Sequence, residues 1–342
     1  MKAVLVKDGK GPIENLYIGD APRPQATLPG QVLVKVKVFG LNRMDIWQRK
    51  GQYPLPPGTT EILGVEFSGS VAEVGPNVQD FHVGDEVFGL TYGGAYAEYV
   101  LVNAGMLLPK GPQLSWEHAA AIPEAWLTAY QALIMVTNVK EGDDVLIHAG
   151  ASGVGIAAIQ LANFFKANRI ITTAGSQEKL DFLKSMPLPP TETVNYKTED
   201  FSKRVAEITS GKGVDVIVDF IGQDYWNKNI SSLALDGRMV LLATLGGNSM
   251  PPGAEITPIL YKRLRIQGST LRSRDQEYQN ELIQGFKRDV LNKIEGCSTG
   301  SQGEGGHYKI YVHKVFKWTE IQEAHREMEQ NKNSGKIVVE IA

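Results

Sequence analysis

Glycines between a short apolar segment and a helical segment carry the clearest chemical signal in this chain. The sequence reads His-Ala-Gly-Ala-Ser-Gly-Val-Gly at 148–155, directly after apolar residues 145–147 and before the helical pattern of 156–165. Glycines in this position let backbone amides approach a pyrophosphate at a helix N-terminus. We therefore expect a dinucleotide site, with the pyrophosphate held at Ser152, Gly153, Val154 and Gly155.

The end of the next predicted strand indicates which dinucleotide binds. A carboxylate about 20 residues past the glycines would accept hydrogen bonds from the adenosine ribose of NAD. Instead, residues 169–173 are followed by Gly175, Ser176 and Lys179, and the third strand by Tyr196. A cation, a hydroxyl and a phenol can hold a 2′-phosphate, so we expect NADPH. The alternative for Lys179 is an ordinary solvated helix lysine.

Composition limits the other classes of function. The chain has 342 residues, enough for two domains, and its formal charge of −3 argues against a dedicated polyanion binder. No apolar run is long enough to cross a bilayer, and the N-terminus turns polar too soon for a secretory leader, so we expect a cytoplasmic enzyme. Cys297 is the only cysteine, which excludes an internal disulfide and a four-cysteine zinc site. We interpret it as an incidental loop thiol.

The chain has two regions with different hydrophobic patterns. The first third has short alternating segments punctuated by glycine, which predict mostly antiparallel strands in a curled sheet. From residue 125, helices and strands alternate, which predicts a parallel sheet of six strands with helices on both faces. The expected helices are 125–136, 154–165, 178–184, 201–209 and 225–235, and the expected strands include 144–148, 170–173, 214–221, 238–242 and 264–268.

The C-terminal elements are expected to return to the first domain. They comprise a helix over 277–294, a strand over 309–316, a helix over 319–331 opened by a capping box of Thr319 and Gln322, and a strand over 335–341. The third of these carries an apolar stripe that includes His325, which we interpret as a core histidine. Segments 186–190 and 296–306 are predicted surface loops.

Nearly the whole chain resembles the zinc-independent quinone oxidoreductase branch of the medium-chain dehydrogenase/reductase superfamily. The segments PEAWLTAYQ, HAGASGVG, TAGSQEKL and LRSRD are most similar to its tumour-suppressor-inducible quinone oxidoreductase subgroup. The resemblance implies an α/β fold: a GroES-like, mostly antiparallel β domain and a Rossmann doubly wound parallel sheet. The GroES-like catalytic domain would span 1–124 and 269–342, the Rossmann NADPH-binding domain 125–268, and the assembly would be a homodimer.

The resemblance also concerns a metal. Zinc-dependent relatives bind catalytic zinc through a cysteine and a histidine, and this chain has Asn42 and Val65 at those positions, although Glu66 remains. An amide and a valine cannot replace such donors, so we expect no metal and no Lewis acid to polarise an alcohol. Hydride transfer to an electron-poor acceptor is the expected chemistry.

Such an acceptor would be a quinone or, alternatively, an enone with an activated double bond. The resemblance places Asn42, Asp45 and Tyr53 near the nicotinamide as candidate catalytic residues, where Tyr53, Asn42 or water could hydrogen-bond the developing charge. Each has a structural alternative: a turn for Asn42, a cap or pair within its helix for Asp45, and a loop anchor for Tyr53. The aromatics Trp47, Tyr92 and Tyr96 either form an apolar substrate wall or belong to packing.

Further cofactor contacts are implied by the resemblance. They are Thr128 facing the nicotinamide, Gly222, Leu245 and Leu271 along the adenine and nicotinamide edges, and Asn333 closing over the phosphate. A second alternative is non-enzymatic, because some relatives serve as NADPH-binding structural proteins or bind RNA. The mixed charges of HREMEQNKNSGK and the absence of a basic stripe argue against binding nucleic acid.

Overall fold

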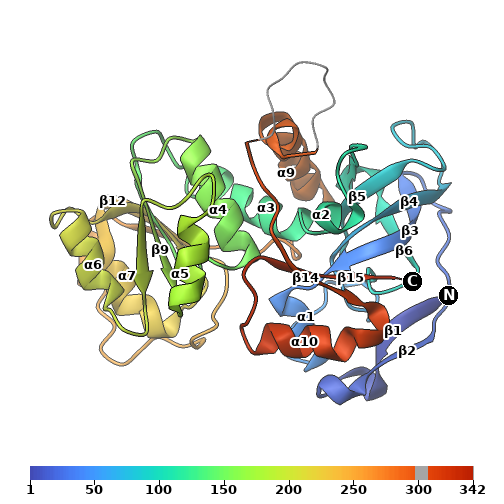
Figure 1. Cartoon of the computed structure of the whole chain (residues 1–342), viewed down its shortest axis with the longest axis horizontal. Helices are drawn as coiled ribbons and strands as arrows, with labels where there is room; N and C mark the ends of the chain where they lie inside the picture. The colour runs from blue at the N-terminus through green and yellow to red at the C-terminus, as the bar shows by residue number, and fades with distance from the viewer. Residues whose placement is uncertain (297–306, 342) are drawn as a thin grey trace. The chain divides into compact units, whose positions relative to one another are not determined.

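The computed structural model describes residues 1–296 and 307–341 (Figure 1). The chain forms two compact units. Unit 1 contains Met1–Leu127 and Leu271–Ala342, and unit 2 contains Thr128–Thr270. The predicted loop thiol, Cys297, and all but the first residue of the predicted loop 296–306 lie outside the described residues.

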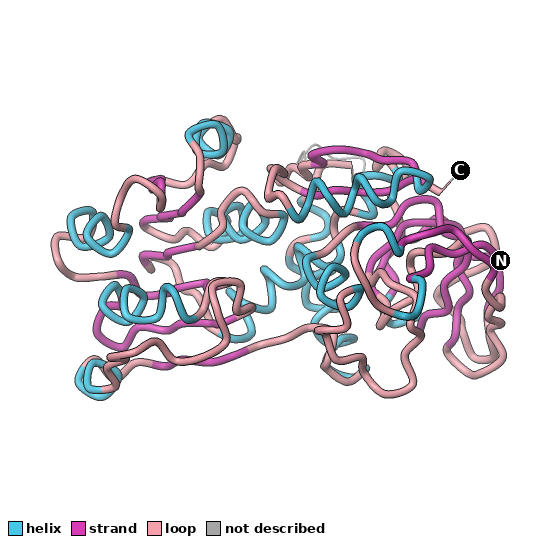
Figure 2. The backbone as a smooth tube through the Cα atoms, turned by 90° about the horizontal axis from the view of Figure 1, so that it is seen from below, coloured by secondary structure: helices cyan, strands magenta, loops and turns pink. Residues whose placement is uncertain are grey.

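Unit 2 is built on a parallel sheet of six strands, in the order β10-β9-β8-β11-β12-β13. Helices flank the sheet (Figure 2), and its central strands at 144–147 and 214–219 are mostly apolar and buried, as expected of parallel strands that are covered on both faces. This is the expected doubly wound architecture. The strands are β8 (Asp144–Ile147), β9 (Arg169–Ala174), β10 (Glu192–Asn195), β11 (Val214–Asp219), β12 (Leu233–Leu241) and β13 (Arg265–Gly268).

The helices of unit 2 agree with the predicted pattern, with two corrections. A short helix at Thr257–Tyr261 was not predicted. The helix expected over 225–235 ends at Ser232, and residues 233–235 begin strand β12 instead. The apolar Leu233 and Ala234 are buried there, so burial in the sheet prevails over their helical propensity. The helices are α4 (Gly153–Phe164), α5 (Gln177–Lys184), α6 (Phe201–Ile208), α7 (Trp226–Ser232) and α8 (Thr257–Tyr261); α3 (Pro123–Tyr130) begins in unit 1 and continues as a π-helical turn, Gln131–Val136.

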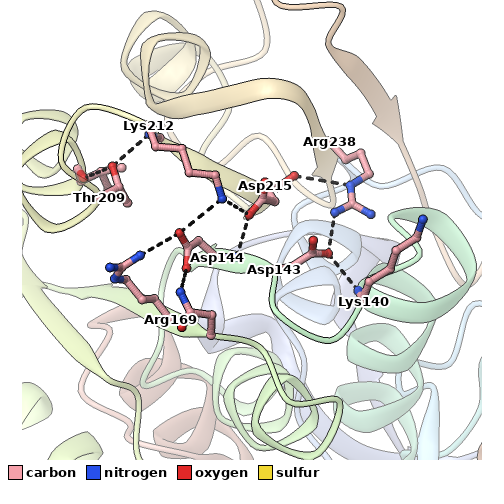
Figure 3. A network of polar contacts seen from close by, with 11 residues as sticks. Lys140, Asp143, Asp144, Arg169, Thr209, Lys212, Asp215 and Arg238 are labelled. Carbon is pink, nitrogen blue, oxygen red and sulfur yellow. Dashed lines mark hydrogen bonds and ion pairs between the residues drawn. The ribbon is translucent and has the colours of Figure 1, made fainter.

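A network of paired charges closes the amino ends of these strands (Figure 3). Arg238 forms an ion pair with Asp143 at 2.5 Å and also donates to the carbonyls of Thr137 and Asn138. Beside them, the buried Asp144 accepts from Asn168 and Arg169, and the Asp215 carboxylate accepts from the Asp144 amide and from Lys212. We call Asp143, Asp144, Arg169, Lys212, Asp215 and Arg238 the amino-end network.

Unit 1 is built on a mostly antiparallel sheet with the order β14-β15-β3-β4-β5-β7, and β6 also pairs with β3. The last strand of the chain, β15, pairs antiparallel with β3, so the C-terminal segment returns to the first unit as predicted. A separate hairpin joins β1 (Lys2–Val6) to β2 (Leu16–Asp20). The sheet strands are β3 (Gln31–Gly40), β4 (Glu66–Val74), β5 (Glu86–Leu90), β6 (Tyr99–Asn103), β7 (Leu107–Pro109), β14 (Val312–Lys317) and β15 (Lys336–Glu340).

The described part of unit 1 contains three short helices and one longer helix, α9, of 14 residues. They are α1 (Arg43–Arg49), α2 (Trp116–Ala120), α9 (Gln276–Asp289) and α10 (Ile321–Glu329). Helix α9 ends five residues before the predicted Ile294, with a short 3₁₀ turn in between, and β14 begins at Val312 rather than Lys309. None of the described helices is long and apolar enough to cross a membrane.

The start of α10 differs from the predicted capping box. A 3₁₀ turn, Trp318–Glu320, precedes the helix, and the Glu320 carboxylate accepts from the amide of Lys317. Gln322 instead donates to the backbone carbonyl of Leu16. Its side chain therefore contacts a distant segment and does not cap the helix. The predicted stripe is confirmed: Ile321, Ala324, His325 and Met328 are all buried.

Candidate active site

The turn between β8 and α4 has the geometry of a phosphate-binding site. Ser152 caps α4, and its hydroxyl accepts from the amide of Gly155 at 3.0 Å, while its own amide donates to Ala149. Within the described residues, the amides of Gly153 and Val154 have no protein acceptor. Two free amides at a helix N-terminus are suited to bind an anion.

Two of the glycines are required by close packing. A Cβ at Gly150 would lie 1.9 Å from the hydroxyl of Thr172, and one at Gly155 would lie 2.4 Å from the carbonyl oxygen of Ala149. Ala149 itself has a φ of 50°, in the left-handed region. The turn therefore has no room for larger residues, and a dinucleotide fits the donors that it presents.

The end of β9 brings together the residues predicted to select the cofactor. Ser176 caps α5 by accepting from the amide of Lys179 at 3.4 Å. Gly175 lies under Tyr196, because a Cβ there would be 2.6 Å from the tyrosine hydroxyl. The Tyr196 ring is 44% exposed and makes an edge contact with Tyr225. The turn that directly follows β9, Gly175 and Ser176, contains no carboxylate.

The remaining predicted cofactor residues fall in both units. Gly222 has a φ of 78° after β11, and Leu245 is 44% exposed, both in unit 2. The Thr128 hydroxyl oxygen is buried without a hydrogen-bond partner among the described residues. Leu271 is buried in unit 1, and Asn333, also in unit 1, donates to the carbonyl of Gly335. Their cofactor contacts stay predictions.

In unit 1, a buried cation joins the two residues that the sequence singled out for metal chemistry. The Lys336 ammonium lies 2.5 Å from the Glu66 carboxylate and donates to the Asn42 amide oxygen at 2.7 Å and to the carbonyl of Leu41. Asn42 in turn donates to Glu66 at 2.8 Å. Both ends of the Asn42 side chain are therefore engaged, and no described residues form a group of three or more His, Cys, Asp or Glu that could hold a metal ion.

Asp45 has the capping role that was one of its two predicted roles, and one of its carboxylate oxygens has no hydrogen-bond partner among the described residues. Its Oδ2 accepts from the amide of Asn42 at 2.8 Å and from the hydroxyl of Tyr96 at 3.1 Å. Its Oδ1 is buried and has no partner among the described residues. Burial raises the pKa of Asp45 to about 6, although the Asn42 amide and the charge of Arg272 oppose the shift.

Tyr53 lies beside an arginine that the sequence did not indicate. The Arg272 guanidinium is 5.4 Å from the centre of the Tyr53 ring. Burial, and to a lesser extent the charge of Glu124, raise the pKa of the Tyr53 phenol, while Arg272 opposes them. Tyr53 is therefore a candidate neutral hydrogen-bond donor at physiological pH.

Glu124 is the other residue that sequence reasoning missed. It lies in the first turn of α3, where its amide donates to Glu66 Oε2 at 2.8 Å, and its own Oε2 is buried without a partner in the described residues. Burial and the nearby Glu66 raise the pKa of Glu124 to about 8, with Lys336 opposing. A signal was present, because Glu124 is the only charged residue between His118 and Tyr130. A lone carboxyl in an apolar segment indicates a perturbed group.

The candidate substrate aromatics belong largely to packing. Tyr96 is fully buried, stacks on Phe39 and shares hydrogen bonds with Asp45 and His325. Trp47 packs against the main core of unit 1, and Tyr92 donates to the carbonyl of Arg274. Arg49 donates to Nδ1 of the buried His325, which confirms His325 as a hydrogen-bonded core histidine.

Comparison with known proteins identifies the family of this chain. The family model of the alcohol dehydrogenase GroES-like domain matches residues 28–112, and that of zinc-binding dehydrogenase matches residues 153–288. Quinone oxidoreductase-like protein 2 of Mus musculus is 30% identical over 99% of this chain and 92% of its own length. The polyketide synthase Pks15/1 of Mycobacterium marinum is 36% identical over 85% of this chain, which spans only 14% of that synthase.

Solved structures give the same fold. An NAD-dependent alcohol dehydrogenase is 34% identical with a TM-score of 0.83, and each chain is covered completely. The CurK enoyl reductase is 29% identical with a TM-score of 0.84, covering 100% of this chain and 99% of its own. The chain belongs to the medium-chain dehydrogenase/reductase superfamily, and the predicted GroES-like and Rossmann fold class is confirmed. The similar proteins include an alcohol dehydrogenase described as NAD-dependent, an enoyl reductase and a quinone oxidoreductase-like protein.

Proposed function

We propose that this protein is an NADPH-dependent, zinc-free quinone reductase. The observation that carries the proposal is the Lys336 ammonium between Asn42 and Glu66. A buried ammonium and a zinc dication would repel each other, and an amide is a poor zinc ligand. Without a Lewis acid, the residues present suit an acceptor that is already electron-poor, such as a quinone.

The cofactor part of the proposal rests on unit 2. The free amides of Gly153 and Val154 would hold the pyrophosphate, and Ser176, Lys179 and Tyr196 the 2′-phosphate end. When bound, the reduced nicotinamide supplies a hydride. The protein's residues then bind and orient the acceptor and manage the proton that completes its reduction.

An enone reductase is the second candidate. Hydride addition to a conjugated double bond leaves a carbanion that must be protonated, and the buried Glu124 is a group that could supply that proton. The similarity to the CurK enoyl reductase favours the same candidate.

One assay separates the candidates. NADPH and NADH consumption is followed with purified protein against an ortho-quinone, a para-quinone, a conjugated enone and, with oxidised cofactor, a simple alcohol. NADPH-dependent quinone loss without alcohol oxidation supports the proposal, and preferential enone reduction supports the second candidate. NADPH binding without turnover of any compound would instead indicate a binding protein.

A homodimer is part of the proposal. Strand β13 is the edge of the unit 2 sheet, and the segment before it exposes apolar side chains that a second copy would cover. These are Ile256, Leu260 and Tyr261, each more than 70% exposed. Light scattering should give twice the chain mass, and Leu260→Glu should lower it. The cytoplasmic location stays a prediction.

A further inference from the structure

Arg272 is held by two of its nitrogens and leaves the third unused. Its Nε donates to the carbonyl of Tyr92 at 2.7 Å, and its Nη1 donates to Gln48 Oε1 at 2.8 Å. The residue is 3% exposed, and its Nη2 is buried without a partner among the described residues. A fixed guanidinium with an unpaired buried donor is costly unless a ligand pairs with it.

Nη2 lies against Gly93. A Cβ at that position would be 3.3 Å from Nη2 and 2.9 Å from the Thr59 side chain. The Tyr53 ring lies close to the guanidinium, and Tyr53, Asp45 and Glu124 all interact electrostatically with Arg272. We call Asp45, Tyr53, Glu124 and Arg272 the acid–arginine cluster.

The cluster contains three unpaired polar atoms in one part of unit 1. They are Arg272 Nη2, Glu124 Oε2 and Asp45 Oδ1, all buried. Native proteins pair almost all such atoms, so three in neighbouring residues indicate a site that a polar ligand completes. A hydrogen-bond donor and a protonatable carboxyl that interact electrostatically match an acceptor whose oxygen gains negative charge during reduction.

We propose that Arg272 and Glu124 bind the carbonyl oxygen of a quinone or enone, with Arg272 Nη2 donating a hydrogen bond and the Glu124 carboxyl supplying the proton. This inference rests on the proposed function and adds to it the two residues that recognise the acceptor. Tyr53 is the neighbouring hydroxyl donor.

The reaction balances with these groups. The acceptor takes up a hydride at a carbon conjugated to its carbonyl, and the displaced π electrons move to the oxygen as an enolate. In a quinone, this enolate becomes the quinol anion when a proton leaves the same carbon and the second carbonyl oxygen takes one up. Arg272 stabilises that oxyanion. The Glu124 O–H bond then breaks, its proton passes to the enolate carbon or the quinol oxygen, and solvent returns a proton to the carboxylate. NADPH and one proton thus reduce one acceptor by two electrons.

The oxyanion half can be tested without turnover. The probe is 2,4-dinitrophenolate, an aromatic oxyanion that stays ionised between about pH 6 and about pH 10. Its binding to the full chain is measured by equilibrium dialysis read by absorbance. Arg272→Gln should weaken binding about 10- to 100-fold, and Arg272→Lys should restore part of the loss. Unchanged affinity in both variants would overturn the assignment of Arg272.

The pH dependence of the same binding tests Glu124. The groups that act on it are Glu66 of β4, Asp45 of α1, Lys336 of β15 and Arg272. Below about 8 the neutral carboxyl donates to the probe, and above it the carboxylate repels the probe. Affinity should therefore fall as pH rises through 8 in the native chain and stay level in Glu124→Gln. A fall of equal size in Glu124→Gln would overturn the assignment of Glu124.

Turnover provides the second readout. Glu124→Gln keeps a hydrogen-bond donor but has no proton to give, so kcat for quinone or enone should fall roughly 100-fold or more while affinity for NADPH is unchanged. The matched controls are Glu117→Gln and Arg274→Gln. Glu117 lies in α2, and the Arg274 guanidinium lies over the Tyr278 ring. Unchanged kcat in Glu124→Gln would refute the proton donor. Probe binding that depends on Arg272 and Glu124 in a protein that reduces no acceptor would refute the proposed function while supporting this site.

Discussion

The amino-end network of unit 2 and the acid–arginine cluster of unit 1 differ in whether their buried polar atoms have hydrogen-bond partners. In the network, every buried side-chain nitrogen or oxygen has a partner, and the Arg238 guanidinium alone contacts Asp143 and three backbone carbonyls. In the cluster, three buried polar atoms have none among the described residues. Satisfied networks stabilise a fold, and unsatisfied ones are retained where a ligand or a proton is handled.

The largest effect on the free energy of unfolding should come from removing Arg238 from the amino-end network. Arg238→Met removes the guanidinium that pairs with Asp143 and donates to three backbone carbonyls, and we expect a loss of about 3 to 5 kcal/mol in the free energy of unfolding. Urea denaturation measures it. The KM for the acceptor should not change in the folded fraction, and a change there would show that the network serves the site as well as the fold.

In the acid–arginine cluster, Glu124→Gln should instead increase the free energy of unfolding at high pH. The native pKa of about 8 lies above the ordinary 4.5, so the folded chain holds an extra proton between these values, and this group's contribution to stability decreases as pH rises from 4.5 to 8. The variant, which cannot ionise, should be a few kcal/mol more stable than the native chain above pH 8 and nearly equal to it below 4.5. Urea denaturation at both ends of this range tests the difference, and a constant difference would contradict the raised pKa.

Lys179→Glu tests the cofactor end of unit 2. A carboxylate near a 2′-phosphate repels it, so the preference for NADPH over NADH should fall roughly 10- to 100-fold in kcat/KM. Lys184→Glu, at the exposed end of the same helix, serves as the control. An unchanged preference in Lys179→Glu would remove this residue from the 2′-phosphate site.

The smallest effect is expected where charges are paired in solvent. Arg263 and Asp236 form an ion pair at 2.6 Å, but their side chains are 59% and 61% exposed. Arg263→Met should therefore change the free energy of unfolding by less than about 1 kcal/mol. A loss as large as that of Arg238→Met would mean that burial does not explain the difference between the two pairs.

The nucleotide turn was predictable because its determinants are local. Strand, glycines and helix follow one another within about 20 residues, and the contact that requires Gly155 comes from the turn itself, whereas the contact at Gly150 comes from Thr172 of the next strand. Two of the predicted boundaries that were wrong, the end of α7 and the start of α10, lie where the backbone or a side chain contacts another segment of the chain.

The acid–arginine cluster was only partly predictable. Asp45 and Tyr53 were named from resemblance, but Glu124 and Arg272 lie 79 or more residues from Asp45 in the sequence and acquire their roles through burial. No spacing rule connects residues on four separate segments. A lone glutamate in an apolar segment was the one available signal.

Sequence alone determined the fold class, the dinucleotide turn and the replacement of metal-binding residue types at Asn42 and Val65, because each follows from residue types that are adjacent or periodic. Tertiary structure decided that Lys336 reaches Asn42 and Glu66, that Asp45 and Glu124 keep unpaired oxygens, and that Arg272 offers one free nitrogen. Burial and pairing depend on which segments pack together, and that packing alone sets the desolvation that shifts a pKa or leaves a donor unsatisfied.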